Sequence, residues 1–107
     1  MLTAEQLAHF ATFGFIVLRQ AFSAEEMAEI SREFDEVLAD DRQGQAFDGA
    51  KRQAVLGFVE RRPLLTGLVE DDRIYGPLEQ VLGPDFVWVG SDGNLYVGDT
   101  QWHPDGS

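Results

Sequence analysis

Residues 86–97 read Phe86-Val87-Trp88-Val89-Gly90-Ser91-Asp92-Gly93-Asn94-Leu95-Tyr96-Val97, and this stretch decides the fold class. Its first four residues are apolar and include β-branched and aromatic side chains, which favours a strand. Residues 90–93 are typical of a turn, and residues 94–97 predict a second strand. Because these two strands follow a series of helices instead of alternating with them, the sequence indicates an α+β fold.

The part of the chain before residue 86 predicts mainly helices. Capping boxes, in which a Ser or Thr is followed three residues later by Glu or Gln, begin at Thr3 and at Ser23. We therefore expect helices over residues 3–13 and 23–40, the first of them ended by Gly14. We also expect a short buried strand at 15–18, a loop at 41–50 and an ambiguous stretch at 51–59. Two more helices are expected at 63–69 and 77–82, beginning at Pro63 and Pro77.

Length and composition limit the class of protein. The chain has 107 residues, of which 44% are hydrophobic and 25% charged, as in one small globular domain. Its net charge of −11 repels phosphate backbones and anionic membranes, so we expect neither nucleic acid nor a membrane as partner. The lack of cysteine excludes a disulfide scaffold and a thiolate metal site. Without a signal-peptide pattern or an apolar stretch of ~20 residues, we expect a cytoplasmic protein.

Two residues near the end of the sequence, His103 and Asp105, are candidates for metal binding. In an extended chain their side chains point the same way, with Cα atoms about 6–7 Å apart. An imidazole nitrogen and a carboxylate oxygen at that spacing can bind one metal ion, and a further His would complete the 2-His-1-carboxylate triad of oxygenase iron. The residues Pro104-Asp105-Gly106 also strongly favour a turn, so the alternative to a metal site is a turn without metal.

The sequence around this pair resembles the phytanoyl-CoA dioxygenase family. Residues 88–106 are similar to the iron-binding strand region of that family, and Trp102-His103-Pro104-Asp105 is the most telling part. Other similar pieces occur in the same order as in the family's N-terminal region, and together they cover nearly the whole chain. They are the start Leu2-Thr3-Ala4-Glu5-Gln6, the run Gly14-Phe15-Ile16-Val17-Leu18, the capped helix from Ser23, and the helix that closes on Leu82-Gly83-Pro84-Asp85.

The resemblance implies a double-stranded β-helix, or jelly-roll, enzyme that uses Fe(II), 2-oxoglutarate and O2 to hydroxylate a small organic substrate. His103 and Asp105 would be the first two iron ligands. In the family, a second His ligand and an Arg that pairs with 2-oxoglutarate follow much later in the chain. We therefore expect residues 1–107 to be the N-terminal portion of a single domain, holding helices and the first jelly-roll strands, and to be inactive alone.

Three more residues are candidates for cofactor binding. Family members can carry a lysine ahead of the central helices that contacts 2-oxoglutarate, and Lys51 lies in a comparable place. Asn94 and Thr100 precede the metal motif and can form hydrogen bonds. Alternatively, Lys51 is a solvated surface residue, and Asn94 and Thr100 have ordinary structural roles in turns and strands.

Two other interpretations of the whole chain stay open. The first is a small acidic interaction domain without catalysis. The second is a degenerate remnant of a dioxygenase. If it is an enzyme, the charge of −11 disfavours a polyanionic CoA thioester, so we expect a small neutral or zwitterionic substrate.

Overall fold

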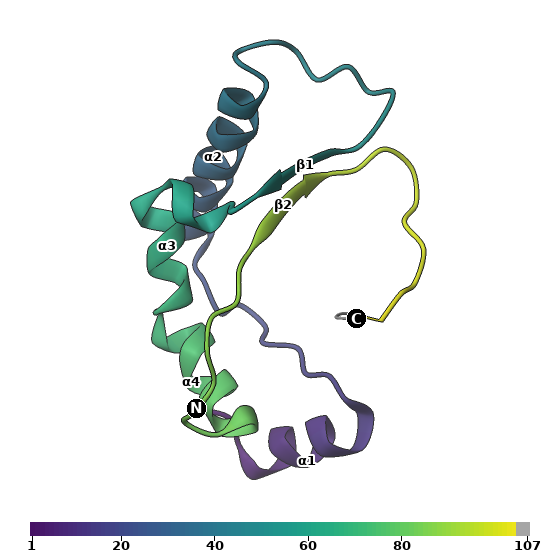
Figure 1. The fold of residues 1–107 in the computed structure, drawn as a ribbon. Coiled ribbons are helices and arrows are strands. Elements are labelled where there is room, and N and C mark those ends of the chain that lie inside the picture. The colour runs from purple at the N-terminus through teal and green to yellow at the C-terminus, as the bar shows by residue number, and fades with distance from the viewer. Residues whose placement is uncertain (105–107) are drawn as a thin grey trace.

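The computed structural model describes residues 1–104 and confirms the α+β class. Within this range, four α-helices and one 3-10 helix accompany a two-stranded antiparallel sheet, with α2 and α3 on one side of the sheet and α1 and α4 below it (Figure 1). None of the helices in the described range is long and apolar enough to cross a bilayer. The elements in chain order are α1 (Ala4–Phe13), α2 (Ala24–Asp41), β1 (Gln53–Leu56), the 3-10 helix η1 (Val59–Arg61), α3 (Pro63–Val69), α4 (Asp72–Leu82) and β2 (Asp92–Leu95).

The first two helices begin at the predicted capping boxes. The Thr3 hydroxyl accepts a hydrogen bond from the Gln6 backbone N–H at 3.1 Å, and the Gln6 side chain accepts one from the Thr3 N–H at 2.9 Å. Ser23 and Glu26 repeat this arrangement at the start of α2 with the same two distances. Gly14 ends α1 at a φ of +80°, in the left-handed region that favours glycine. Both predicted helices are thereby confirmed to within about a residue.

The fourth helix is longer than the sequence predicts. α3 has the predicted bounds, but α4 begins at Asp72 instead of Pro77. Asp71 is its N-cap, because its carboxylate accepts a hydrogen bond from the Arg73 backbone N–H at 2.9 Å. Pro77 therefore lies inside the helix, where its missing N–H removes one internal hydrogen bond. The predicted start was wrong because this side-chain cap outweighs the preference of proline for the first turn.

The sheet pairs β1 with β2, so that Gln53 lies opposite Leu95 and Val55 opposite Gly93. β1 resolves the ambiguous stretch 51–59, and β2 both begins and ends two residues before the predicted strand at 94–97, so Tyr96 and Val97 are not part of it. The reason is Gly93, because a Cβ at this position would overlap the Phe58 ring. The missing side chain lets the strand approach the core closely, and the predicted turn residues 92–93 become part of the strand.

Two predicted strands, 15–18 and 86–89, are not strands. Both segments lack regular secondary structure, and neither has a paired neighbour within residues 1–104. Their outward side chains are well exposed: Val17 by 55%, Val87 by 79% and Val89 by 93%. The composition suits a strand, but a strand also needs a partner backbone, which the described part of the chain does not provide.

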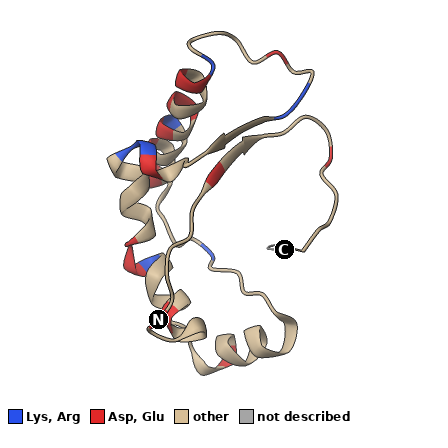
Figure 2. Cartoon of the chain, in the orientation of Figure 1, with Lys and Arg blue, Asp and Glu red and all other residues tan. Residues whose placement is uncertain are grey.

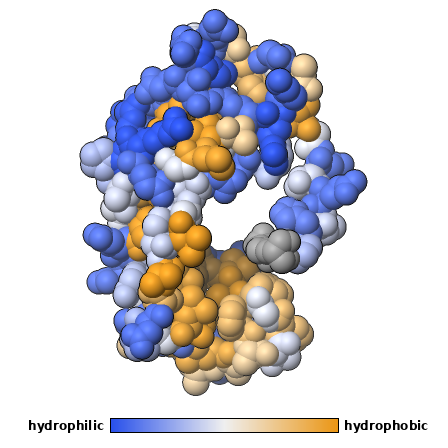
Figure 3. Space-filling view, viewed as in Figure 1, coloured by the Kyte–Doolittle hydropathy of each residue, from blue (hydrophilic) through white to orange (hydrophobic). Residues whose placement is uncertain are grey.

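The hydrophobic core lies between α2, β1 and α3. It consists of Val37, Leu38, Val55, Phe58 and Leu65, each at most 3% exposed. The radius of gyration, 16.2 Å, exceeds the roughly 13 Å of a compact domain of this size. Figure 3 shows the reason: a wide opening separates the hydrophilic upper part from the largely apolar surface around α1. Packing is thus concentrated in one part of the molecule.

Candidate functional site

His103 lies in an extended segment that follows β2, residues 96–104, which we call the His103 arm (Figure 1). The arm contains no helix or strand, and each of its residues is exposed. Trp102, beside His103, is 103% exposed and so contributes nothing to the core. Burial of its own side chains therefore does little to hold the arm in place.

The imidazole ring of His103 is oriented by the backbone of the arm. Its Nδ1 atom lies 3.0 Å from the carbonyl oxygen of Gln101, close enough for an N–H to donate to that oxygen. A proton on Nδ1 places the lone pair of a neutral imidazole on Nε2. Metal-binding histidines commonly have this arrangement, with one nitrogen on the metal and the other N–H on a backbone carbonyl. The chemistry of His103 therefore fits a metal ligand acting through Nε2.

The concave side of the His103 arm forms a cavity of about 780 Å³. This volume lies in the usual range for small-molecule sites, about 300–1,000 Å³. Two predicted site residues, Thr100 and His103, are brought together there. The complete lining is Tyr96, Gly98, Asp99, Thr100, Gln101, Trp102 and His103.

The second predicted metal ligand, Asp105, lies outside the described residues. Within residues 1–104, no three His, Asp or Glu side chains come close enough together to hold a metal ion. The described range therefore contains one candidate ligand, His103, and not a complete metal centre.

The other two predicted cofactor-binding residues do not line this cavity in the part formed by residues 1–104. Asn94 lies in β2, where its Nδ2 donates to the Asp92 carboxylate at 3.0 Å and its Oδ1 is buried without a donor. Lys51 lines a different cavity of about 370 Å³. The structure thus unites Thr100 with His103 but leaves Lys51 and Asn94 apart from them.

Arg52, which the sequence analysis did not single out, contacts Tyr96 of the His103 cavity but itself lines the same separate cavity as Lys51. It precedes β1 and faces Tyr96, which follows β2, with its guanidinium carbon 5.6 Å from the centre of the Tyr96 ring. This contact continues the register in which Gln53 pairs with Leu95. Arg52 could be identified only from the pairing of β1 with β2. Local sequence does not reveal this pairing.

Glu60 anchors the entry to β2. Its carboxylate accepts hydrogen bonds from Trp88 Nε1 at 3.0 Å and from the Ser91 hydroxyl at 2.8 Å. The Ser91 hydroxyl in turn accepts one from the Val59 backbone N–H at 3.0 Å. The backbone N–H of Glu60 itself, followed by Ser91 and Trp88, lowers the pKa of Glu60. This carboxylate is therefore a structural acceptor that ties the start of β2 to η1.

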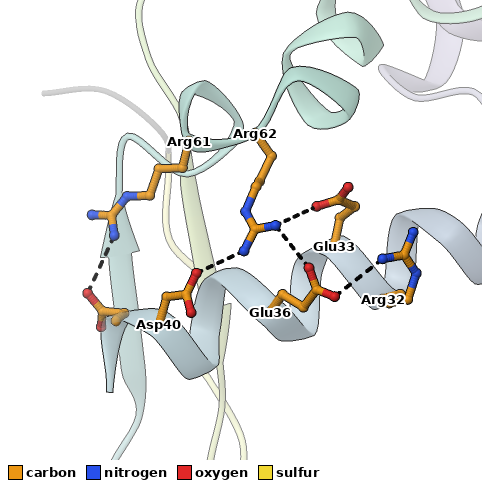
Figure 4. Close-up of polar contacts among 7 residues, drawn as sticks. Arg32, Glu33, Glu36, Asp40, Arg61 and Arg62 are labelled. Atoms are coloured by element: carbon orange, nitrogen blue, oxygen red, sulfur yellow. Dashed lines mark hydrogen bonds and ion pairs between the residues drawn. The ribbon is translucent and has the colours of Figure 1, made fainter. Parts of the chain in front are cut away.

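Three carboxylates on α2 bind Arg62, which lies between η1 and α3, and so fix these two helices against α2 (Figure 4). The Arg62 guanidinium donates to Asp40 at 2.8 Å, to Glu36 at 2.9 Å and to Glu33 at 3.2 Å. Asp40 first, and then Glu33 and Glu36, raise the pKa of Arg62. The dense acidic charge of α2 in Figure 2 therefore has a structural partner.

No protein-family model, curated protein or solved structure matches this chain. Any functional assignment therefore depends on the residues themselves and on their arrangement.

Proposed function

We propose that this chain supplies the first part of an Fe(II)- and 2-oxoglutarate-dependent dioxygenase of the phytanoyl-CoA dioxygenase type, which hydroxylates a small organic molecule in the cytoplasm. The observation that carries the proposal is the setting of His103. Its Nδ1 contacts a backbone carbonyl, and its ring lines a cavity of small-molecule size. The order of the motifs along the chain, ending in Trp102-His103-Pro104-Asp105, supports the same assignment.

Four residues of the arm, and Asp105 beyond it, have definite roles in this proposal. His103 binds iron through Nε2 while the Gln101 carbonyl holds the ring at the correct angle, and Asp105 supplies the second ligand. Thr100 donates a hydrogen bond to a ligand in the cavity, and Trp102 forms part of the cavity wall. An iron ion held by His103 and Asp105 would supply the O2 chemistry that couples decarboxylation of 2-oxoglutarate to hydroxylation of a C–H bond.

The unpaired apolar segments support the jelly-roll part of the proposal. Within residues 1–104, β1 and β2 form a sheet of two strands, and such a sheet is rarely stable by itself in water. Residues 15–18 and 86–89 are apolar and exposed, as strands of a larger sheet would be without their neighbours. In the proposed enzyme, further strands of the jelly roll cover these edges.

The test is the replacement of both ligands in a protein that contains the complete site. His103→Ala and Asp105→Ala should each abolish iron binding and 2-oxoglutarate decarboxylation together, because a facial triad has only three protein ligands. Asp105→Glu should also be severe, since one extra methylene moves the carboxylate beyond the ~0.5 Å tolerance of a preorganised site. Lys51→Ala should at most raise the 2-oxoglutarate requirement. The measurements are iron content and succinate formation.

His9 provides a matched control for the ligand test. It is the other of the two histidines in the sequence, and its Nδ1 contacts the Phe15 carbonyl oxygen at 3.0 Å. His9→Ala should retain iron and turnover. If His103→Ala also retains wild-type iron and turnover, the motif is a turn and the dioxygenase proposal is wrong.

The 107-residue protein alone should not turn over. Residues 1–104 contain no group of three metal-binding side chains, and His103 with Asp105 gives two ligands, which leaves iron readily exchangeable. We expect no succinate above background with Fe(II), 2-oxoglutarate, ascorbate and candidate substrates. Coupled turnover by a monomer would contradict the half-site argument.

The second candidate function is that of an acidic interaction domain, and the exposed apolar segments at 15–18 and 86–89 favour it. The two functions differ in their response to metal. Ni(II), a surrogate for Fe(II), should perturb the His103 ring signals in an NMR titration if the chain is a dioxygenase. If the chain is an interaction domain, Ni(II) should change the His103 ring signals no more than it changes those of His9.

A further inference from the structure

The His103 cavity has an acidic and aromatic wall. Among the lining residues that the structure describes, Asp99 supplies the single carboxylate, Tyr96 and Trp102 supply aromatic rings, and no Lys or Arg is present. The cavity, of about 780 Å³, is large enough for a small organic molecule. The chemistry of its wall therefore limits which molecules can be bound.

The carboxylate of Asp99 is available to a ligand. The residue is exposed, and within residues 1–104 its side chain forms no ion pair. Arg62 and Arg73 instead bind carboxylates of the helices and their caps. With 19 Asp and Glu against 8 Lys and Arg, the chain leaves this carboxylate to be neutralised by a cation from outside.

The indole of Trp102 is the second feature of the wall. Its side chain is 103% exposed, so nothing within residues 1–104 packs on either face of the ring. Tyr96 differs, because the guanidinium carbon of Arg52 lies 5.6 Å from the centre of its ring. The face of an indole attracts cations more strongly than that of any other aromatic side chain. Trp102 is thus the ring that remains for a ligand cation.

We infer that the His103 cavity binds a small molecule that carries an organic ammonium group, held through Asp99 and Trp102. The carboxylate neutralises the charge, and the indole face contacts the carbon atoms bonded to the nitrogen. The net charge of −11 also attracts cations from beyond contact distance. The ammonium compound is then the substrate of the proposed dioxygenase. This role in a reaction rests on the proposed function, but the binding itself requires no metal.

The test is a metal-free titration of the full 107-residue protein with choline, a trimethylammonium probe. Its uncharged isostere dimethylbutanol, in which carbon replaces the nitrogen, is the comparison. The readout is the indole Nε1–H NMR signal of Trp102, with Trp88 as internal reference because its Nε1–H donates to Glu60 at 3.0 Å. Choline should shift the Trp102 signal and leave that of Trp88 in place. The isostere should bind at least about tenfold more weakly, because it lacks the charge.

Two substitutions separate the two contacts. Asp99→Asn removes the charge and Trp102→Ala removes the ring, and each should weaken choline binding at least about threefold. Trp102→Phe should bind with intermediate strength, because it keeps a smaller aromatic face. Calorimetry measures the affinity of the variants that lack the indole. Since both side chains are exposed, the fold should be retained in all of them.

Asp85→Asn is the matched control, because it changes the net charge by the same amount. Asp85 is also exposed and without an ion pair in the described range, but it does not line the His103 cavity. It should bind choline as the wild type does. The inference is overturned if choline leaves the Trp102 signal in place, if the uncharged isostere binds as tightly as choline, or if Asp85→Asn loses as much affinity as Asp99→Asn.

A separate Ni(II) titration of the His103 ring signals distinguishes this failure from failure of the proposed function. Absence of choline binding with an intact Ni(II) response overturns the ammonium site alone. Choline binding without any Ni(II) response overturns the metal site and leaves Asp99 and Trp102 as the binding site of a non-catalytic domain. Asp99→Asn should keep the wild-type Ni(II) response. Its loss would make Asp99 a metal ligand and would overturn the inference.

Discussion

The packed region formed by α2, β1, η1 and α3 contrasts with the His103 arm. In the packed region, Val37, Val55 and Phe58 are at most 3% exposed, and ion pairs from Arg62 join α3 to α2. In the arm every residue is exposed, although it carries the candidate chemistry. The contrast shows that the residues that stabilise this fold are separate from those that would perform its function. Substitutions should therefore affect stability and ligand binding independently.

The largest expected effect is on stability, and it compares two aromatic residues, one from each region. Phe58→Ala should lower the free energy of unfolding by about 3–5 kcal/mol, because it opens a cavity where Phe58 packs against Phe34 and Gly93. Trp102→Ala should change it by less than about 0.5 kcal/mol, since the side chain buries nothing. Urea denaturation followed by circular dichroism measures both. Equal destabilisation would show that the arm is packed in solution.

The second prediction compares substitutions at two glycines to test how closely β2 approaches the core. Gly93→Ala should cost about 1–3 kcal/mol, since the new methyl group overlaps the Phe58 ring and forces the strand or the ring to move. Gly90→Ala is the control, because a Cβ there meets nothing within 4 Å. The same denaturation experiment compares them. A neutral Gly93→Ala would mean that β2 can shift away from Phe58 at no cost.

The third prediction concerns the apolar segment 86–89, which leads into β2. An exposed, unpaired apolar segment invites self-association, so the 107-residue protein should associate in a concentration-dependent way and show a broad melting transition. The double variant Val87→Lys/Val89→Lys should reduce this association severalfold in sedimentation velocity. Ala8→Lys/Ala11→Lys adds the same charge on exposed positions of α1 and should have little effect. A monodisperse wild-type monomer with a sharp melting transition would contradict this expectation.

The parts of the fold that the sequence predicts correctly are those that depend on neighbouring residues. The capping boxes at Thr3 and Ser23 act across three residues, and both helices begin where they predict. The strands predicted at 15–18 and 86–89 failed because a strand requires a distant partner that composition cannot reveal. The early start of β2 likewise depends on Phe58, which lies 35 residues before Gly93 in the chain.

The candidate site follows the same division between local and distant information. Thr100 and His103 are close in sequence and share one cavity, as their spacing suggests. Lys51 was chosen by family resemblance, yet it lines another cavity together with Arg52, and only Arg52 contacts Tyr96. The contact of Arg52 with Tyr96 follows from the strand register, since Gln53 pairs with Leu95, and this pairing is not visible from local sequence.

The smallest expected effect is the acid sensitivity of a surface cluster that joins α2 to α4. The Arg73 guanidinium lies 2.8 Å from Glu26 and 2.8 Å from Asp71. Its hydrogen bonds, with help from the Ser23 backbone, lower the pKa of Glu26 from 4.5 to about 2. They also lower the pKa of Asp71 from 3.8 to about 2.

Between pH 4.5 and pH 2 the unfolded chain therefore binds more protons at these two carboxylates than the folded chain, so stability rises with pH in this window. The stabilisation is fully present above pH 4.5 and is lost as the pH falls towards 2. It should be modest, because the groups face solvent. Melting temperatures measured from pH 2 to 6 should show a shallower acid slope for Arg73→Gln than for Arg19→Gln. Equal slopes would mean that the acid response arises elsewhere in the packed region, where Arg62 holds three further carboxylates.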